Sequence, residues 1–400
     1  MPVLNYLYPE SKQINSGFIL KLLDKVPSYI TYFSELFGQY PFINEKYGHA
    51  EWLISGGMEH STVSFMGHYA WSDMLIIHEL AHQWFGDQYT CATWNDIWLN
   101  EGFATYAELL MYEHEAKKDP TMQYKYDNWF ITNTTRILND GREGSVYNPY
   151  PDDYNRTFSS VLSYRKGGMV LHQLRTVLGD DVFFHAVRTF LDESQFNFVT
   201  TEDFKQSLKN STGRDLTEFF NDWIYGEGYP VFDLTITGNA INNVYLKVDQ
   251  TQTHPSVSFF ETLFKVKFIG PGNESVIREF NLTQNHQTFQ ITDIPFEIKE
   301  VVFNPNLDVI AKENKITVIN EVIKSEESVK IIMNPVSNLL AVTSTDRIQG
   351  IRIYDQSGRL IESANVNHTS FFMPTTNWHT GIYIVKVESS KGDFSKKIRK

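Results

Sequence analysis

The chain has 400 residues, of which 42% are hydrophobic, and a chain of this length usually folds as more than one domain. Its 35 basic and 48 acidic side chains give a net charge of -13, which argues against nucleic acid or an anionic membrane surface as the main partner. The single cysteine, Cys91, excludes an intrachain disulfide, and the absence of a long apolar run predicts no membrane span.

The amino-terminal part begins with a predicted strand and continues with helices. Residues 3–8 are rich in strand-forming types, and Pro9 interrupts them. Apolar residues then recur at helical spacing over 16–38, where Pro27 is expected to split the pattern into two helices.

Residues 51–60 are typical of an edge strand. Gly56 and Gly57 lie within it, and paired glycines allow another group to approach the backbone closely. A simple bulge is the alternative interpretation of this pair.

The sequence HELAH over residues 78–82 predicts a metal site. His78 and His82 are about one helical turn apart, so both imidazoles leave the same face and can bind one ion. The flanking residues are mostly apolar, which predicts a buried helix whose histidines need partners. A buried histidine pair without metal is the competing interpretation.

Glu101 is the expected third ligand, at the start of a second helix predicted over 102–115. A His-His-Glu set leaves one position open for water, as catalytic zinc sites do. One zinc ion is favoured because the ligands offer nitrogen and oxygen and no redox step is needed, although cobalt or manganese would also fit. Glu79 would then take a proton from water and deliver it to a leaving amine, which predicts peptide hydrolysis.

Two aspartates are candidate partners for the zinc-binding rings. A ligating imidazole usually donates its other N–H to a carboxylate or a carbonyl, and Asp87 or Asp96 could accept it. Either residue could instead cap a helix.

Further helices are predicted over 163–177, 180–192 and 202–211, and alternating strand patterns begin after residue 228. The fold class is therefore multidomain: a mainly helical catalytic domain with a small edge sheet, followed by two small β-sandwich domains. The expected segments are a strand in 1–12, the catalytic domain in 13–228, a β-sandwich in 229–320, a linker in 321–330 and a second β-sandwich in 331–400.

Four motifs together resemble the aminopeptidase N and leukotriene hydrolase family of zinc metallopeptidases, the gluzincins. They are GGMEH at 56–60, HELAHQWFGD at 78–87, WLNEGFA at 98–104 and SYRKG at 163–167. The resemblance covers about residues 1–230. It implies a thermolysin-like catalytic domain with His78, His82 and Glu101 as zinc ligands and Glu79 as the general base.

The resemblance also implies how substrate is held. The family's glycine-rich motif, usually GAMEN, maps onto Gly56, Gly57 and Glu59, and its glutamate holds the free amino terminus of the peptide. Tyr164 matches the tyrosine whose hydroxyl stabilises the oxyanion. This sequence departs from the usual motif at Gly57 and His60.

The two ends carry different expectations. Family members normally begin with a large β-rich domain whose last strand residues 5–9 resemble, so we expect an amino-terminally truncated chain. Residues 331–400 resemble the sorting domain of type IX secretion, which implies a Bacteroidetes-type protein handled by that machinery and secreted or displayed at the cell surface, although no signal peptide is present in this chain. An ordinary adhesive β-sandwich is the alternative.

The leading functional hypothesis is a secreted zinc aminopeptidase acting on peptides. An endopeptidase of thermolysin type is the alternative within the same chemistry. A weakly active remnant whose β-domains serve binding or surface display is the alternative from another class.

Overall fold

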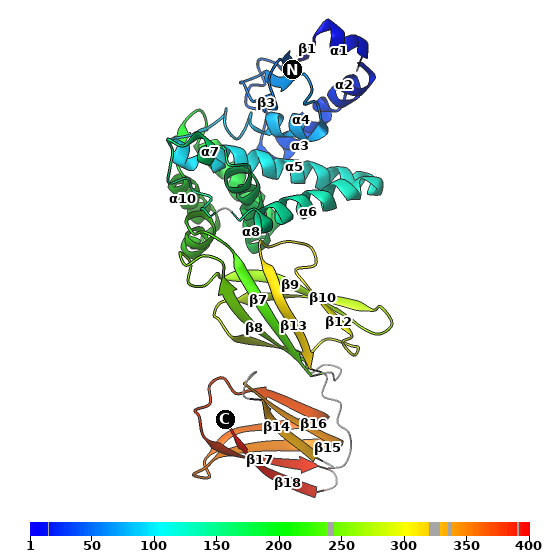
Figure 1. The fold of residues 1–400 in the computed structure, drawn as a ribbon, viewed down its shortest axis with the longest axis vertical. Coiled ribbons are helices and arrows are strands. Elements are labelled where there is room, and N and C mark those ends of the chain that lie inside the picture. Colours follow the sequence, from blue (N-terminus) through cyan, green and yellow to red (C-terminus); the bar gives the residue numbers. More distant parts are fainter. Residues whose placement is uncertain (15, 142, 239–243, 320–328, 335–337, 390–391) are drawn as a thin grey trace. The chain divides into compact units, whose positions relative to one another are not determined.

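The computed structural model describes residues 1–14, 16–141, 143–238, 244–319, 329–334, 338–389 and 392–400. The chain divides into two compact units, and each is described by itself. The first contains Met1–Pro230, Gln252–Leu263 and Asn306–Lys312, and the second contains Val231–Thr251, Phe264–Pro305 and Glu313–Lys400. The protein is thus multidomain, with a mainly helical unit and a β-rich unit (Figure 1).

A four-stranded sheet lies at the amino-terminal end of the first unit. Its strand order is β1-β2-β4-β3. The bounds are β1 Val3–Tyr6, β2 Tyr47–Trp52, β3 Gly57–Met58 and β4 Ser64–Gly67. The edge strand predicted over 51–60 is therefore wrong as a single element: its start belongs to the inner strand β2, and only β3 forms the edge. Gly56 separates them with φ +80°, a conformation that favours glycine.

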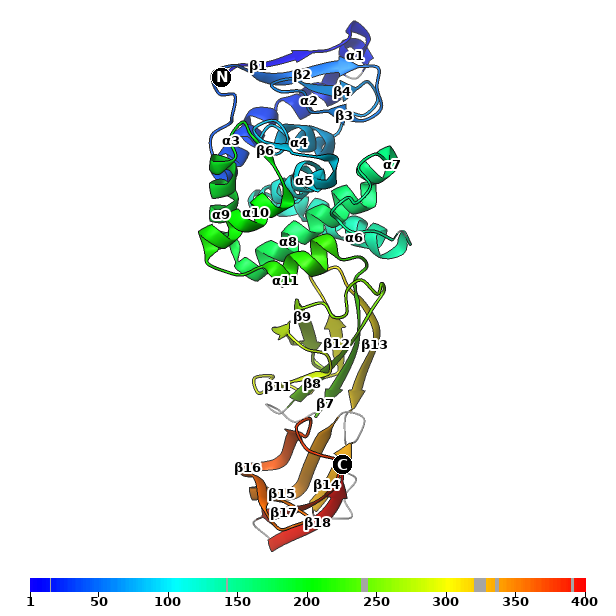
Figure 2. The ribbon, with the colours of Figure 1, turned by 90° about the vertical axis from the view of Figure 1, so that its left-hand side faces the viewer.

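The helices that follow carry the predicted site. Pro27 lies in the first turn of α3, so it divides α2 (Ser16–Leu23) from α3 (Val26–Phe37) as expected. Ser72 caps α4 (Asp73–Ala81) by accepting a hydrogen bond from the Leu75 N–H at 3.2 Å. Every residue from 76 to 81 is buried, because α4 packs between the sheet and α5 (Trp98–Lys118) (Figure 2).

The remaining elements of the first unit are mostly helices packed around α5. They are α1 Pro9–Ile14, β5 Thr90–Cys91, η1 Trp94–Asp96, η2 Pro120–Met122, α6 Gln123–Asn139, α7 Tyr154–Thr157, η3 Ser160–Lys166, α8 Gly167–Leu178, α9 Asp180–Glu193, β6 Phe198–Val199, α10 Thr201–Thr212, α11 Thr217–Phe220 and η4 Asn221–Tyr225. The later segment around Ile310 also joins this unit, where its N–H donates to the Gln173 side chain on α8 at 2.7 Å.

Glycines let α5 approach α8 closely. A Cβ atom added to Gly102 would lie 3.1 Å from the Cα of Gly167, and one added to Gly168 would lie 3.2 Å from a methyl group of Thr105. Real Cβ atoms are rarely this close to other atoms. With larger residues at these positions, the two helices could not lie as close together as they do. This contact brings η3, which directly precedes Gly167, next to the start of α5.

Replacing Gly102 with alanine is expected to lower the free energy of unfolding by about 1–3 kcal/mol, because the added methyl group must displace the backbone of α8. Urea denaturation measures this change. Gly17→Ala is the matched control, since Gly17 is helical with nothing within 4 Å of an added Cβ, and it should stabilise the protein by about 0.4–1 kcal/mol. Equal effects at both positions would contradict the close approach.

The first β-region of the second unit consists of two sheets packed face to face. The sheets have the orders β11-β8-β7-β13 and β10-β9-β12. Phe232 on β7 stacks on Phe264 on β9 with ring centroids 5.5 Å apart, so side chains from both sheets share one core. The bounds are β7 Pro230–Thr237, β8 Val244–Gln252, β9 Thr262–Ile269, β10 Ser275–Leu282, β11 Gln287–Ile291, β12 Glu300–Phe303 and β13 Lys312–Ile319.

The carboxyl-terminal strands, predicted as a second β-sandwich, pair into one continuous sheet in the described residues, and side chains from both halves of this sheet share one core. The bounds are β14 Val329–Asn334, β15 Leu339–Asp355, β16 Leu360–Pro374, β17 Ile382–Ser389 and β18 Gly392–Arg399. The first half of β15 pairs with β14 and the second half with β17, while β16 follows its other side. Register shifts between Thr343 and Gly350 divide the long strand into these halves.

The linker predicted over 321–330 lies outside the described residues except for its last two, which begin β14. Across the part of the chain that is described, no helix combines the length and the apolar character that crossing a membrane requires.

Candidate functional site

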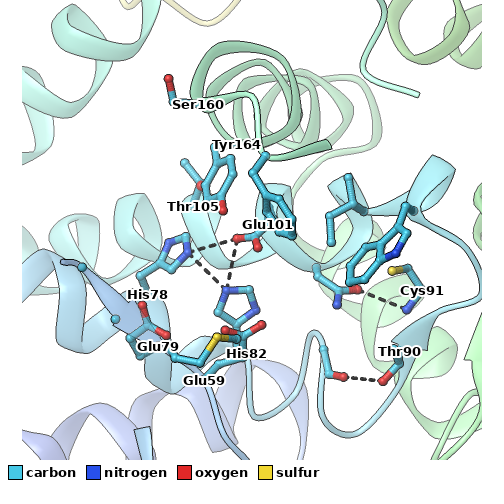
Figure 3. Close-up of a pocket in the computed structure, with 18 of the residues that line it drawn as sticks. Glu59, His78, Glu79, His82, Thr90, Cys91, Glu101, Thr105, Ser160 and Tyr164 are labelled. Atoms are coloured by element: carbon cyan, nitrogen blue, oxygen red, sulfur yellow. Dashed lines mark hydrogen bonds and ion pairs between the residues drawn. The ribbon is translucent and has the colours of Figure 1, made fainter. Parts of the chain in front are cut away.

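Three buried side chains converge at the centre of the first unit. His78 belongs to α4, His82 follows it as the C-cap, and Glu101 lies in the first turn of α5. The two Nε2 atoms are 3.2 Å apart, and each lies 3.3 Å from Oε2 of Glu101 (Figure 3). A tetrahedral ion with ligand bonds of about 2.0–2.1 Å places its ligand atoms about 3.3 Å apart. The spacing therefore fits a zinc ion, and these residues could hold one.

Each ring is fixed by a partner on its other nitrogen. Nδ1 of His78 lies 2.9 Å from Oε1 of Glu108, whose second oxygen accepts a hydrogen bond from the indole N–H of Trp129 at 3.1 Å. Nδ1 of His82 lies 2.9 Å from the carbonyl oxygen of Phe85. With Nδ1–H donating in both rings, the two Nε2 atoms keep their lone pairs for a metal.

The predicted ring partners Asp87 and Asp96 are wrong. Asp87 accepts from the Gln83 amide at 2.7 Å. Asp96 accepts from the backbone N–H and the hydroxyl of Thr201 at 2.8 and 2.7 Å, at the start of α10, whose N-cap residue is Thr200. The sequence does contain a signal for Glu108, which follows Glu101 by seven residues and so faces the same side of α5 two turns later.

Glu79 is the predicted base, and its carboxyl group is confined. The side chain is 4% exposed, and its Oε2 has no hydrogen-bond partner among the described residues. Burial raises the pKa of Glu79 to about 7, although the nearby His78 and His82 act to lower it. A Cβ atom at Gly57 would lie 2.3 Å from Oε1 of Glu79, so the glycine leaves room for this carboxylate beside the edge strand.

The charges around the three convergent residues favour a cation. Burial alone would lower the pKa of His82, but the carboxylates of Glu59 and Glu101 outweigh it and raise the pKa to about 9. Burial would likewise raise the pKa of Glu101, but His82 and His78 hold it well below its usual range. Positive charge at the meeting point of these groups is therefore stabilised, and a divalent ion would bring such charge.

Tyr164 and Glu59 approach the same place from two other elements. The ring of Tyr164, on the π-helical turn η3, stacks on His78 with centroids 5.9 Å apart and planes at 11°. Burial raises the pKa of Tyr164 well above its usual range, which keeps the hydroxyl protonated. Glu59 follows β3, and its carbonyl oxygen accepts from Gln83 at 3.2 Å. His60 packs edge-on against Phe65, at 4.7 Å between ring centroids.

A cavity of about 1190 Å³ joins these groups into one cleft. Its lining includes all eight predicted site residues, Gly56, Gly57, Glu59, His78, Glu79, His82, Glu101 and Tyr164. The same cleft is lined by aromatic residues that the sequence did not single out, Trp94, Tyr154 and Phe158. Nothing local in the sequence connects Trp94 with Phe158, because 64 positions separate them.

Two segments match known protein families. Residues 26–223 match the peptidase family M1 domain, and residues 330–400 match the secretion system C-terminal sorting domain.

Curated relatives match the first of these segments. The chain is 32% identical over 174 residues to "Probable aminopeptidase 2" of Sulfurisphaera tokodaii, which covers 42% of this chain and 22% of that protein. It is 30% identical over 171 residues to "Aminopeptidase N" of Lactococcus lactis subsp. lactis, covering 42% and 20%. The chain thus spans about a fifth of the length of these relatives.

A solved structure shares the fold. The structure of Legionella pneumophila aminopeptidase A in complex with aspartic acid superposes with a TM-score of 0.60 at 16% identity, covering 78% of this chain and 36% of that one. At this identity the likeness concerns the fold alone.

Proposed function

We propose that this chain, whose residues 26–223 match the peptidase family M1 domain and whose residues 330–400 match a secretion sorting domain, is a secreted zinc-dependent aminopeptidase that removes amino-terminal residues from peptides. The observation that carries the proposal is the convergence of His78, His82 and Glu101 at 3.2–3.3 Å beside the buried carboxyl of Glu79.

The reaction follows from the groups around this point. When bound by His78, His82 and Glu101, zinc would acidify a water molecule and polarise the scissile carbonyl. Glu79 takes the proton from the attacking water and passes it to the departing amine, a task that suits a carboxyl with a pKa near neutrality. The protonated hydroxyl of Tyr164 donates a hydrogen bond to the carbonyl oxygen as that oxygen gains negative charge.

Substrate binding is assigned to the edge of the sheet. Among the described residues β3 pairs with β4 alone, so its other edge could pair with an extended peptide beside Gly56 and Gly57. Glu59 follows directly and would bind the free ammonium group of the first residue as an ion pair. Such a contact limits cleavage to the first peptide bond.

Hydrolysis of aminoacyl anilides by the zinc-loaded protein tests this proposal. Free peptides should lose residues one by one from the amino end, whereas peptides with an acetylated amino terminus should stay intact. Cleavage of blocked peptides at a matching rate would favour an endopeptidase, and bound zinc without turnover on any peptide would favour a binding role.

Replacing Glu108 with glutamine is expected to weaken zinc binding by about 10–100-fold, because the amide no longer orients and polarises the His78 ring as the carboxylate does. Competition with a chelator of known affinity measures the change. Glu193→Gln is the control, since Glu193 accepts a hydrogen bond from Ser207 away from the cleft. Unchanged zinc affinity in Glu108→Gln would contradict the role of this contact.

Export is proposed to depend on the carboxyl-terminal sheet. The sorting domain points to a secreted or cell-surface protein handled by the type IX secretion machinery. Expression in a bacterium that has this machinery, with and without residues 330–400, checks the expectation: the shortened chain should stay inside the cell. Its appearance in the medium would count against the proposal.

A further inference from the structure

One cationic side chain lines a cleft that is otherwise rich in carboxylates. Arg165, in the π-helical turn η3, is the only arginine or lysine among the described residues that line the cavity. The same cavity is lined by the glutamates Glu59, Glu79, Glu101 and Glu108. An arginine in such a place is a candidate for the recognition of an anionic group on a ligand.

A buried asparagine fixes the direction of the guanidinium group. Arg165 donates a hydrogen bond from Nη1 to the side-chain oxygen of Asn133 at 2.6 Å. Asn133 lies on α6 and is 3% exposed, and its own amide N–H donates to the carbonyl oxygen of Trp129 at 2.7 Å. Arg165 is therefore held at the cleft wall before any substrate arrives, which lowers the entropic cost of binding.

Balancing the charge of a neighbouring glutamate would be the ordinary role of such an arginine. Burial lowers the pKa of Arg165, and the carboxylate of Glu108 acts against that shift. However, Glu108 bonds with one oxygen to His78 at 2.9 Å and with the other to Trp129 at 3.1 Å. In the part of the chain that is described, Arg165 makes no ion pair with it or with any other carboxylate. A guanidinium group has several N–H donors, so most of them remain available to a ligand.

Arg165 lies across the metal-binding residues from Glu59. Figure 3 shows Glu59 below His82 and Tyr164 above His78, so these two groups approach the metal-binding residues from opposite sides. Arg165 follows Tyr164 directly in η3 and lines the same cavity. A peptide with its amine at Glu59 and its scissile carbonyl at the hydroxyl of Tyr164 therefore directs the next residue away from Glu59, towards the wall that contains Arg165.

We propose that Arg165 binds a carboxylate of the residue that directly follows the scissile bond. This assignment rests on the proposed aminopeptidase function and names its substrate class. The carboxylate is either the terminal one of a dipeptide or the side chain of an acidic second residue. Both present two oxygens that a planar guanidinium group can bind with two parallel hydrogen bonds.

Two pairs of substrates separate the two sources of the carboxylate. Alanyl-alanine against alanyl-alaninamide tests the terminal carboxylate, and alanyl-aspartate α-amide against alanyl-asparaginamide tests the side chain. In the zinc-loaded protein, kcat/KM should be higher for the carboxylate member of at least one pair, and that pair identifies the source. Arg165→Gln should lower this ratio by about 10–100-fold, because a hydrogen bond between charged groups is lost. No preference in either pair would overturn the proposal.

Arg136→Gln is the matched control. Arg136 is an exposed arginine on the same helix as Asn133 and lies outside the cleft lining, so its replacement removes the same charge and should leave both ratios unchanged. Arg165→Lys is a second variant that keeps the charge but not the planar pair of donors, and its ratio should fall by less than that of Arg165→Gln. A wild-type ratio in folded, zinc-loaded Arg165→Gln would overturn the proposal, as would an equal fall in Arg136→Gln.

Calorimetric binding keeps this test separate from that of the enzymatic activity. Zinc-loaded Glu79→Gln protein should bind the favoured carboxylate peptide more tightly than its amide, and adding Arg165→Gln should remove the difference. Equal binding of the two peptides would overturn the proposal even if the wild type is an active enzyme. The expected preference in binding, together with a wild type that hydrolyses no peptide, would overturn only the aminopeptidase function.

Discussion

Glu79→Gln is expected to lower kcat on an aminoacyl anilide by on the order of 1,000-fold, because the amide keeps the shape of the side chain but cannot accept and release the proton. The burial of Glu79 supports a large effect: the side chain is 4% exposed, and its Oε2 has no competing hydrogen-bond partner in the part of the chain that is described. Steady-state kinetics measure the loss, and metal analysis should still find one zinc ion per chain.

The matched control is Glu218→Gln, an exposed glutamate outside the cleft, which should retain full activity. A Glu79→Gln protein that binds zinc and keeps more than a tenth of the wild-type kcat would assign the proton transfer to another group.

Glu101→Gln is expected to weaken zinc binding by at least about 100-fold and to abolish turnover with it. Loss of an outer partner of a metal ligand costs about 10–100-fold, so loss of a charged ligand should cost at least the upper end of that range. The oxygen that lies 3.3 Å from both Nε2 atoms would carry no full negative charge, and the cation would lose that stabilisation. Zinc content after dialysis against a competing chelator measures the change.

The zinc affinity of Glu108→Gln is the control for this prediction, because a smaller loss of affinity is expected there. Glu108 touches only the far side of His78, so its loss should be the smaller one. Similar zinc affinities for Glu101→Gln and wild type, with circular dichroism showing both proteins folded, would exclude Glu101 as a ligand.

The sequence predicted the parts of the site that depend on local geometry. The four-residue spacing of His78 and His82 places both rings on one face of the helical turn that ends α4, whatever surrounds it. The hydrogen-bond partners of the two histidine rings do not follow from local spacing in this way. Glu108 meets His78 only because α5 crosses α4 at this point, and the Phe85 carbonyl reaches His82 because the chain turns directly after the helix.

The errors in the fold have similar causes. Residues 51–60 have the composition of one strand. The positive φ of Gly56 turns the chain within this segment, however, and pairing with β4 makes β3 a separate edge strand. In the carboxyl-terminal region the alternating pattern revealed strands, yet the pattern does not specify which strands share the long β15. Strand pairing is a property of distant segments, and alternation reports only the local backbone.

Asn148 bonds to the two segments that form the aromatic wall of the cleft (Trp94, Tyr154 and Phe158), and these segments are distinct from the helices of the proposed metal site. The proposed metal ligands and base come from α4 and α5, inside the helical core, whereas the aromatic wall is carried by the connecting segments on either side of Asn148. Trp94 and Tyr154 are exposed and stand on other elements than the proposed ligands, so their side chains can be exchanged without altering α4 or α5. The shape of this wall can therefore be changed while the proposed ligands and base stay in place.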